Sequence, residues 1–461
     1  MRTLSLLQSR VAGTPFYVPV MMAALAMGPL LAWAIAGEYW RSLVLVCLVA
    51  ISPIVVRWPV VVGFGAFALV LPFDSVSVIA DTGGATATKF VGIAVTGAML
   101  LTGIIQRRLV RPPLVALWVT VLVFWAVLSL AWAADVDRAR TPAMTAVSLL
   151  AMYLVAASYT VSEAELTTVC WLALIGGALA AAGGVVLGFD PDSGQTGRGT
   201  LSLGESSANP NAVAQSLLLP FAIGIGMFSG SRRTWTTVVA GVGIAAIAAG
   251  IFLTMSRGSL FAVAVTICVC LYRYRARPRV LVVVAILAAL LPAMPDLFFH
   301  RAESVFTGED ATGAGRTEIW KIGVHSLDRF SVIGVGFANF AAAYDQYAYP
   351  AFGRSRVAHN MYLSTWVELG IVGLVLLALV LRGHWRLTKH AKIPSSQVPL
   401  APALEAACIG FAVVGFFGDA LWDKMFWTQW ILIIWLSRTR HDRLISESSA
   451  RGTLAGLATH G

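Results

Sequence analysis

The sequence predicts an all-α polytopic membrane protein with about 12–14 transmembrane helices and one large extracytoplasmic loop that contains short helices. Of its 461 residues, 58% are hydrophobic and only 12% are charged, whereas soluble domains carry roughly 25% charged residues. Apolar runs near the roughly 20 residues needed to cross a bilayer recur along the whole chain. The basic residues stand in short clusters between these runs. That placement is typical of residues that set membrane topology, so the net charge of +10 does not indicate a nucleic-acid partner.

Fourteen apolar runs are candidate membrane spans, and the shortest of them could be paired half-helices, which would reduce the number to twelve. The first run follows Arg2 and Arg10 and exceeds the apolar region of a signal peptide, so we interpret it as an uncleaved helix. The candidate spans are 15–36, 41–56, 58–73, 88–105, 113–132, 141–160, 166–188, 209–229, 234–254, 257–272, 279–298, 359–381, 402–418 and 420–437.

The basic residues predict the orientation of the chain. With the N-terminus in the cytoplasm and alternating spans, 20 of the 33 Lys and Arg residues face the cytoplasm, and seven lie in short outer loops. The positive-inside rule favours this arrangement. It places both termini in the cytoplasm and the polar segment 299–358 outside. A loop this long is uncommon unless it is functional or disordered, and its apolar periodicity over 316–329 indicates a folded segment with helical turns.

His359-Asn360, where the long loop meets the next span, is the first candidate for chemistry. Histidine is the side chain best suited to proton transfer near neutral pH. The alternative is an interfacial histidine that only caps the helix.

Several arginines are predicted to share the outer side with His359. The guanidinium group binds phosphate through paired hydrogen bonds, so together these residues indicate a site for a lipid-linked phosphate or diphosphate. Each alone has a simpler alternative, a snorkelling side chain at the headgroup level or a solvated helix face. The candidates are Arg257, Arg316, Arg198, Arg354 and Arg356.

A metal site is the rival interpretation. Divalent ions prefer carboxylate oxygens, and four outer carboxyl groups fall in Asp135-Val136-Asp137 and Asp190-Pro191-Asp192, with Asp74 and Asp81 predicted on the same side. The DxD spacing is a weak signal, and we expect no metal. The five cysteines all fall inside apolar runs without a CxxC, so they predict no disulfide framework. No Gly-rich nucleotide-binding loop stands on the cytoplasmic side, which argues against a nucleotide-driven pump or a nucleotide-sugar enzyme.

At these residues the sequence resembles the O-antigen ligase and O-antigen polymerase superfamily of bacterial membrane glycosyltransferases. The resemblance covers roughly residues 195–385. The matching stretches are Leu253-Thr254-Met255-Ser256-Arg257-Gly258, Gly315-Arg316-Thr317-Glu318-Ile319-Trp320, Gly334-Val335-Gly336-Phe337-Ala338-Asn339-Phe340, His359-Asn360-Met361-Tyr362-Leu363 and Glu368-Leu369-Gly370, with Asn209-Pro210-Asn211 upstream.

The resemblance implies a glycosyltransferase C-type (GT-C) fold and a reaction without metal, nucleotide or cofactor. A glycan on undecaprenyl diphosphate would be transferred to an acceptor hydroxyl at the outer face of the membrane. His359 would take the role of the family's essential histidine, and Arg257 and Arg316 would hold the diphosphate. Arg198, Arg354 and Arg356 are further binding candidates, and Asn360, Trp320 and Tyr362 are supporting residues.

The same motifs serve a ligase of lipopolysaccharide, a glycan polymerase and a protein O-oligosaccharyltransferase, and we favour the ligase slightly. A transporter or flippase of lipid-linked glycans is the alternative from another class, but it usually has pseudo-symmetric halves, and no repeat is visible. We divide the chain into N-terminal transmembrane helices (1–194), a ligase-like catalytic region (195–385) with the loop 299–358, and C-terminal helices with a cytoplasmic tail (386–461).

Overall fold

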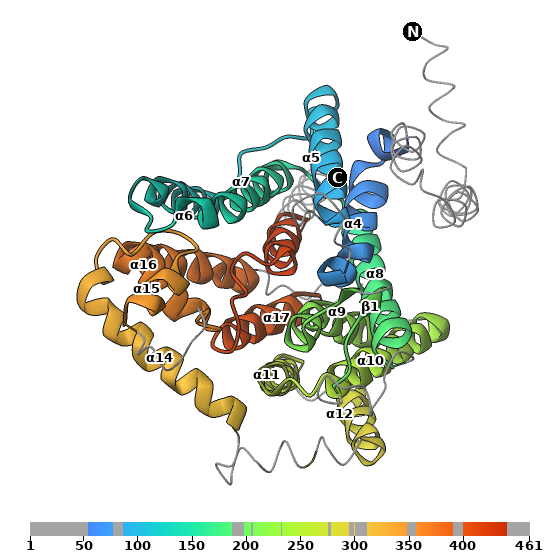
Figure 1. Ribbon diagram of the computed structural model, residues 1–461. Coiled ribbons are helices and arrows are strands. Elements are labelled where there is room, and N and C mark those ends of the chain that lie inside the picture. The colour runs from blue at the N-terminus through green and yellow to red at the C-terminus, as the bar shows by residue number, and fades with distance from the viewer. Residues whose placement is uncertain are drawn as a thin grey trace, which may run out of the picture.

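The computed structural model describes residues 54–76, 86–186, 198–203, 206–231, 233–274, 278–294, 299, 311–347, 356–390 and 400–439. Almost all of its regular structure is helical (Figure 1). The one hairpin pairs β1 (Ser202–Leu203) with β2 (Ser206–Ser207) antiparallel, with Ser202 opposite Ser207. The helices are η1 (Pro59–Phe64), α4 (Gly65–Val70), η2 (Leu71–Val76), α5 (Ala87–Ile105), α6 (Val115–Leu128), η3 (Ser129–Trp132), α7 (Val136–Ser158), α8 (Glu163–Leu179), η4 (Ala180–Val186), α9 (Pro210–Gly230), α10 (Thr234–Leu253), α11 (Arg257–Arg273), α12 (Pro278–Leu290), η5 (Leu291–Ala293), α14 (Ala311–Phe330), α15 (Phe340–Tyr347), α16 (Met361–His390), α17 (Leu400–Val414) and a last helix over residues 424–439.

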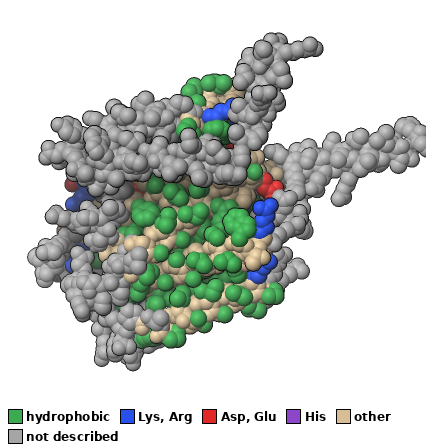
Figure 2. Space-filling model, turned by 90° about the vertical axis from the view of Figure 1, so that its right-hand side faces the viewer, with side chains coloured by type: hydrophobic (Ala, Val, Ile, Leu, Met, Phe, Trp, Pro, Cys, Tyr) green, Lys and Arg blue, Asp and Glu red, His purple; other side chains and the backbone are tan. Residues whose placement is uncertain are grey.

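The predicted class, an all-α polytopic membrane protein, is confirmed. Among the described residues, seven helices are long and apolar enough to cross a membrane, and three shorter apolar helices accompany them. Every candidate span from residue 58 onward coincides with helical structure. The spans 15–36 and, except for its last residues, 41–56 lie outside the described residues. Figure 2 shows one broad face covered by hydrophobic side chains with basic groups at its edge, the surface expected of a bilayer-facing bundle.

Helix α9 lies at the centre of one half of the bundle, where it contacts α8, α10, α11 and α17 (Figure 1). Almost all residues in the apolar stretch of this helix are buried inside the protein. Small residues allow this close approach, because Gly177 of α8 packs directly against Pro220 of α9. Membrane helices associate mainly through such packing.

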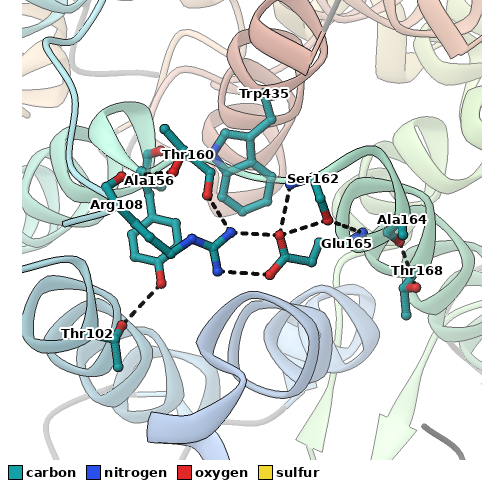
Figure 3. Close-up of polar contacts among 10 residues, drawn as sticks. Thr102, Arg108, Ala156, Thr160, Ser162, Ala164, Glu165, Thr168 and Trp435 are labelled. Carbon is teal, nitrogen blue, oxygen red and sulfur yellow. Dashed lines mark hydrogen bonds and ion pairs between the residues drawn. The ribbon is translucent and has the colours of Figure 1, made fainter. Parts of the chain in front are cut away.

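The helix ends fall on two faces, and polar contacts join distant segments on each. On the first, called the basic face, the loops 106–114 and 159–162 pair through Val110 N–H and the Ser158 carbonyl (2.8 Å). Arg108 donates two hydrogen bonds to the Glu165 carboxylate, at 3.0 and 2.7 Å (Figure 3). Burial opposes the charge of Arg108, yet the Glu165 carboxylate holds the pKa of this guanidinium above its usual value. The opposing Arg273 and Glu405 of α11 and α17 form a second ion pair at 2.6 Å.

The other face, called the loop face, consists of the loops 133–135, 198–209, 254–256, 331–339, 356–360 and 415–423. The described contacts join these loops to one another. Asp135 N–H donates to the Asn339 side chain at 2.8 Å, and Gly199 N–H donates to the Leu253 carbonyl at 2.7 Å. Lys424 donates to both oxygens of Asp74, at 2.7 and 2.9 Å, so the start of the last helix is attached to η2. The charge pattern predicts all of these loops on one side of the membrane, and the structure places them next to one another.

Helix α16 is broken at Gly370, whose backbone (φ 67°, ψ −170°) is not helical. Segment 331–336 crosses the break. It supplies hydrogen-bond partners for the backbone groups that the break leaves unpaired within the helix. Val335 N–H donates to the Val367 carbonyl at 2.9 Å, and Ile371 N–H donates to the Ser331 carbonyl at 2.8 Å. Gly370 packs against the Val332 backbone, where a side chain has no room.

We therefore expect Gly370→Ala to destabilise the protein by roughly 3 kcal/mol or more, because the new Cβ meets backbone in a conformation that already favours glycine. Thermal unfolding of the purified protein measures the effect. Gly97→Ala on α5 is the matched control, since its new Cβ meets nothing within 4 Å. Equal melting temperatures for the two variants would contradict this interpretation of the break.

Candidate active site

His359 stands immediately before α16 with a left-handed backbone (φ 47°). Asn360, not His359, caps the helix: its side-chain oxygen accepts hydrogen bonds from the N–H groups of Tyr362 and Leu363, both at 3.0 Å. The imidazole is therefore not needed as a cap, which removes the simpler alternative for this residue. A strained backbone at a polar residue is a frequent property of functional sites.

The carboxylate of Asp419 holds this turn in place. It accepts backbone hydrogen bonds from His359 and Asn360 and a side-chain hydrogen bond from Ser364. Asp419 is exposed at the cavity wall; the protein atoms around its carboxyl group displace water and raise its pKa, although the neighbouring His359 and these donors oppose the shift. The sequence analysis missed Asp419, because it lies in a short loop 60 positions after His359 and belongs to no recognisable motif. Its one signal was an acidic residue between two apolar runs, which seldom occurs without a partner.

The charge around His359 favours the neutral imidazole. Burial lowers the pKa of His359 most, Asp419 raises it, and Arg316 and Arg356 lower it. A neutral imidazole near pH 7 can accept a proton. Arg316 and Arg356 thus act on the charge of His359, while their binding of a diphosphate stays a prediction.

Helix α14 carries Arg316 and is hydrogen-bonded to the backbone around His359, residues 358–360, which we call the histidine turn. Trp320, one helical turn after Arg316, donates its indole N–H to the Ala358 carbonyl at 2.9 Å. Arg316 is half-buried and Arg356 is exposed. This hydrogen bond fixes the residue directly before His359, and the supporting role of Trp320 in the reaction stays a prediction.

Arg257 begins α11 after a strained turn at Met255 (φ 49°). Gly258 packs directly against Phe417, two residues before Asp419, so the turn that carries Arg257 lies against the loop that holds His359. Arg198 fixes this turn from the other side: it donates to the Thr254 carbonyl at 2.8 Å and to the Asn211 side chain at 2.9 Å. Two nitrogens of Arg198 therefore bind protein, which favours positioning of the Arg257 turn over direct contact with phosphate.

The remaining predicted residues are placed as follows. Tyr362 donates its hydroxyl to the Ala412 carbonyl at 2.6 Å and packs on Phe416, so it connects α16 to α17. Arg354 lies outside the described residues.

Glu368 connects the Gly334–Phe340 loop to α16. Its two oxygens accept from Ala338 N–H at 2.9 Å and from Phe340 N–H at 3.1 Å. Ser364 donates to the same carboxylate at 3.3 Å. The side chain is buried, and three donors satisfy it, as a buried carboxylate requires. Glu368 thus positions the loop next to the histidine turn.

A cavity of about 550 Å³ opens beside this turn. Val357 and Met361, which flank the histidine turn, lie on its wall together with Asp419 and Glu368. This volume falls in the range of roughly 300–1,000 Å³ that is typical of small-molecule sites.

The acidic residues weighed as metal ligands have other partners. Asp135 caps α7 through Arg138 N–H, Asp137 pairs with Arg140 at 2.9 Å, and Asp74 binds Lys424. In the described part of the chain, no group of three or more His, Cys, Asp or Glu side chains is arranged to hold a metal. Asp81, Asp190 and Asp192 lie outside it.

The charges around His359 predict opposite effects for two substitutions. Asp419→Asn should lower the pKa of His359 further below 6.5, because it removes the negative charge that raises it. Arg356→Gln should raise this pKa, because a positive charge is lost. NMR titration of histidine-labelled protein, with the His359 signal assigned by its absence in His359→Gln, measures both shifts. Lys321→Gln, an exposed change on α14, should have no effect. Shifts of equal sign in the first two variants would refute the assignment.

Comparison with known sequences found one similar family for this region. Residues 242–378 match the sequence model of the family described as O-antigen ligase. The matched stretch contains Arg257, Arg316 and His359, whereas Arg198 and Asp419 lie outside it. No curated protein matches the chain. The match covers less than a third of the chain, and it supports the O-antigen ligase superfamily that the sequence analysis predicted.

Proposed function

We propose that this protein transfers a glycan from a polyprenyl diphosphate, most simply undecaprenyl diphosphate, to an acceptor hydroxyl. The observation that carries the proposal is the histidine turn: a half-buried His359 shares its surroundings with Asp419, Arg316 and Arg356 inside an O-antigen ligase domain. Ligation to a lipid-linked core, as in lipopolysaccharide assembly, is the leading reaction. Polymerisation of glycans and transfer to protein hydroxyls use the same chemistry.

In this mechanism, neutral His359 takes the proton of the acceptor hydroxyl while the hydroxyl oxygen attacks the anomeric carbon. The bond from that carbon to the diphosphate oxygen breaks, and the polyprenyl diphosphate leaves with the electron pair. Arg257 and Arg316 stabilise the charge that develops on the leaving group. Asp419 stabilises the imidazolium once the proton has moved, in the way a carboxylate supports a catalytic histidine. The donor supplies the driving force, so the proposed reaction requires neither nucleotide nor metal.

We further propose that the loop face is extracytoplasmic and the basic face cytoplasmic, in a bacterial inner membrane. The charge distribution supports this orientation through the positive-inside rule. The two chain ends, which we expect in the cytoplasm, lie outside the described residues.

Replacing the proposed base tests the chemistry. His359→Ala should lower the transfer rate by about 10²–10⁴-fold, the usual contribution of a general base. The assay uses purified protein, a polyprenyl diphosphate glycan and an acceptor glycolipid, with product followed by mass spectrometry. Arg257→Ala and Arg316→Ala should weaken donor use, and Lys321→Ala on α14 serves as the control. Wild-type transfer by His359→Ala would exclude the mechanism, and loss of activity with a chelator would show that a metal is needed.

Thiol labelling tests the orientation. A cysteine introduced at Gly313 in α14 should react with an impermeant maleimide in intact spheroplasts. Thr234→Cys, at the exposed start of α10 on the basic face, should react only after lysis. The reverse pattern would invert the topology.

A further inference from the structure

The turn that follows α14 exposes two neighbouring aliphatic side chains at its tip. Val332 is 64% exposed and Ile333 is 48% exposed. The charge pattern predicts this turn in the polar outer segment, where bare aliphatic groups side by side would cost hydrophobic free energy in water. An apolar partner outside the protein would remove that cost.

The same tip continues an apolar surface of α16. Ile371 N–H donates to the Ser331 carbonyl at 2.8 Å, and the backbone of Val332 packs on Gly370. Beyond the break, α16 belongs to a stretch that is long and apolar enough to cross a membrane. Its first exposed aliphatic side chains there are those of Ile371, Val372 and Val375. Val332 and Ile333 therefore extend a surface that we expect to face lipid.

Helix α6 indicates how deep the tip lies. Its apolar stretch Val115–Trp132 is also long enough to span a membrane, and the loop face begins directly after it. Within this stretch, Trp125 donates to the Leu369 carbonyl next to the break at 2.9 Å. Trp125 stands seven positions before Trp132, which is about 10 Å along a helix. The break and the tip that packs on it thus lie at the depth of apolar residues of α6.

Polar side chains are ordered along α14 as they would be at a membrane surface. Beside the tip, the exposed Arg329 lies over the Phe330 ring at 5.4 Å, and the Trp366 indole donates to the Ser331 carbonyl at 3.2 Å. Basic and aromatic side chains of this kind are typical of the headgroup layer. Further from the tip, one face of α14 carries a polar stripe of largely exposed side chains, those of Lys321, His325 and Asp328.

We propose that Ser331–Ile333 is a membrane-inserted tip, with Val332 and Ile333 among the acyl chains of the leaflet on the loop-face side. Helix α14 lies along the surface of that leaflet with its polar stripe in water. It runs at the edge of the molecule beside α15 and α16, where lipid can reach it (Figure 1). Elements bound in this way reach roughly 5–10 Å into the boundary between headgroups and acyl chains, which agrees with the depth given by α6.

Insertion would also fix the height of the candidate site. It would hold α14, and with it Arg316, next to the headgroup layer, where the diphosphate of a lipid-linked donor has to lie. This consequence rests on the proposed function, whereas the insertion itself does not.

Fluorescence quenching in liposomes tests the insertion without any turnover. Val332→Cys and Ile333→Cys, each in a Cys47→Ser/Cys268→Ser background, are labelled with a bimane; the other three cysteines are buried. Phospholipids brominated near the headgroup end of the acyl chains should quench both labels. Iodide in the water should quench them several-fold less than a label in contact with solvent.

Two matched positions calibrate the measurement. Val324→Cys, at a 57% exposed position of α14 beside the polar stripe, should be quenched by iodide and not by brominated lipid. Val375→Cys, at a 51% exposed position of α16 beyond the break, should be quenched most by bromines near the methyl end of the chains.

The outcomes are independent of the transfer reaction. Equal iodide quenching at Val332→Cys, Ile333→Cys and Val324→Cys overturns the inserted tip, even if His359→Ala abolishes transfer. Quenching of both tip labels by brominated lipid supports insertion, and it would stand even if His359→Ala kept the wild-type rate.

Discussion

The broken helix α16 is the constraint on which the rest of the loop face depends. A chain inside a bilayer must satisfy its backbone polar groups within the protein, so a break at Gly370 is possible only where another segment supplies partners. Segment 331–336 does so, with Gly336 N–H reaching the Glu368 carbonyl at 3.0 Å, and Trp125 donates to the Leu369 carbonyl at 2.9 Å. The long loop is thereby anchored in the membrane domain, and the start of α16, with His359, acquires a fixed position relative to it.

Charges of both signs act on that anchored turn. Burial, Arg316 and Arg356 lower the pKa of His359, whereas Asp419 raises it and accepts hydrogen bonds from the backbone of the turn. In the proposed reaction the positive charges suit the anionic donor, and the neutral imidazole can receive the proton of the acceptor hydroxyl as the diphosphate departs.

The N-terminal and C-terminal helices are joined at both faces. Lys424 reaches Asp74, Thr86 and Thr88 on the loop face, whereas Trp435 donates to the Ala156 carbonyl at 2.7 Å near the basic face (Figure 3). Arg198 joins two segments of the loop face, since it donates to the Thr254 carbonyl and to the Asn211 side chain. These contacts fix helices that lie outside residues 242–378, the stretch that matches the family's sequence model.

The sequence by itself determined the membrane class and the positions of the apolar helices from residue 58 onward, and it predicts the sides on which the loops lie. Hydrophobic length and basic clusters are local properties, so no tertiary information was needed. Motif order likewise brought His359, Arg257 and Arg316 together as candidates. Only the tertiary structure decided that Asn360 is the cap, that Arg198 holds a turn and that Asp419 supports His359. The roles of Arg198 and Asp419 depend on contacts with Thr254 and His359, which lie 56 and 60 positions away in the sequence, and neither composition nor periodicity encodes which distant side chain will fill a given hydrogen bond.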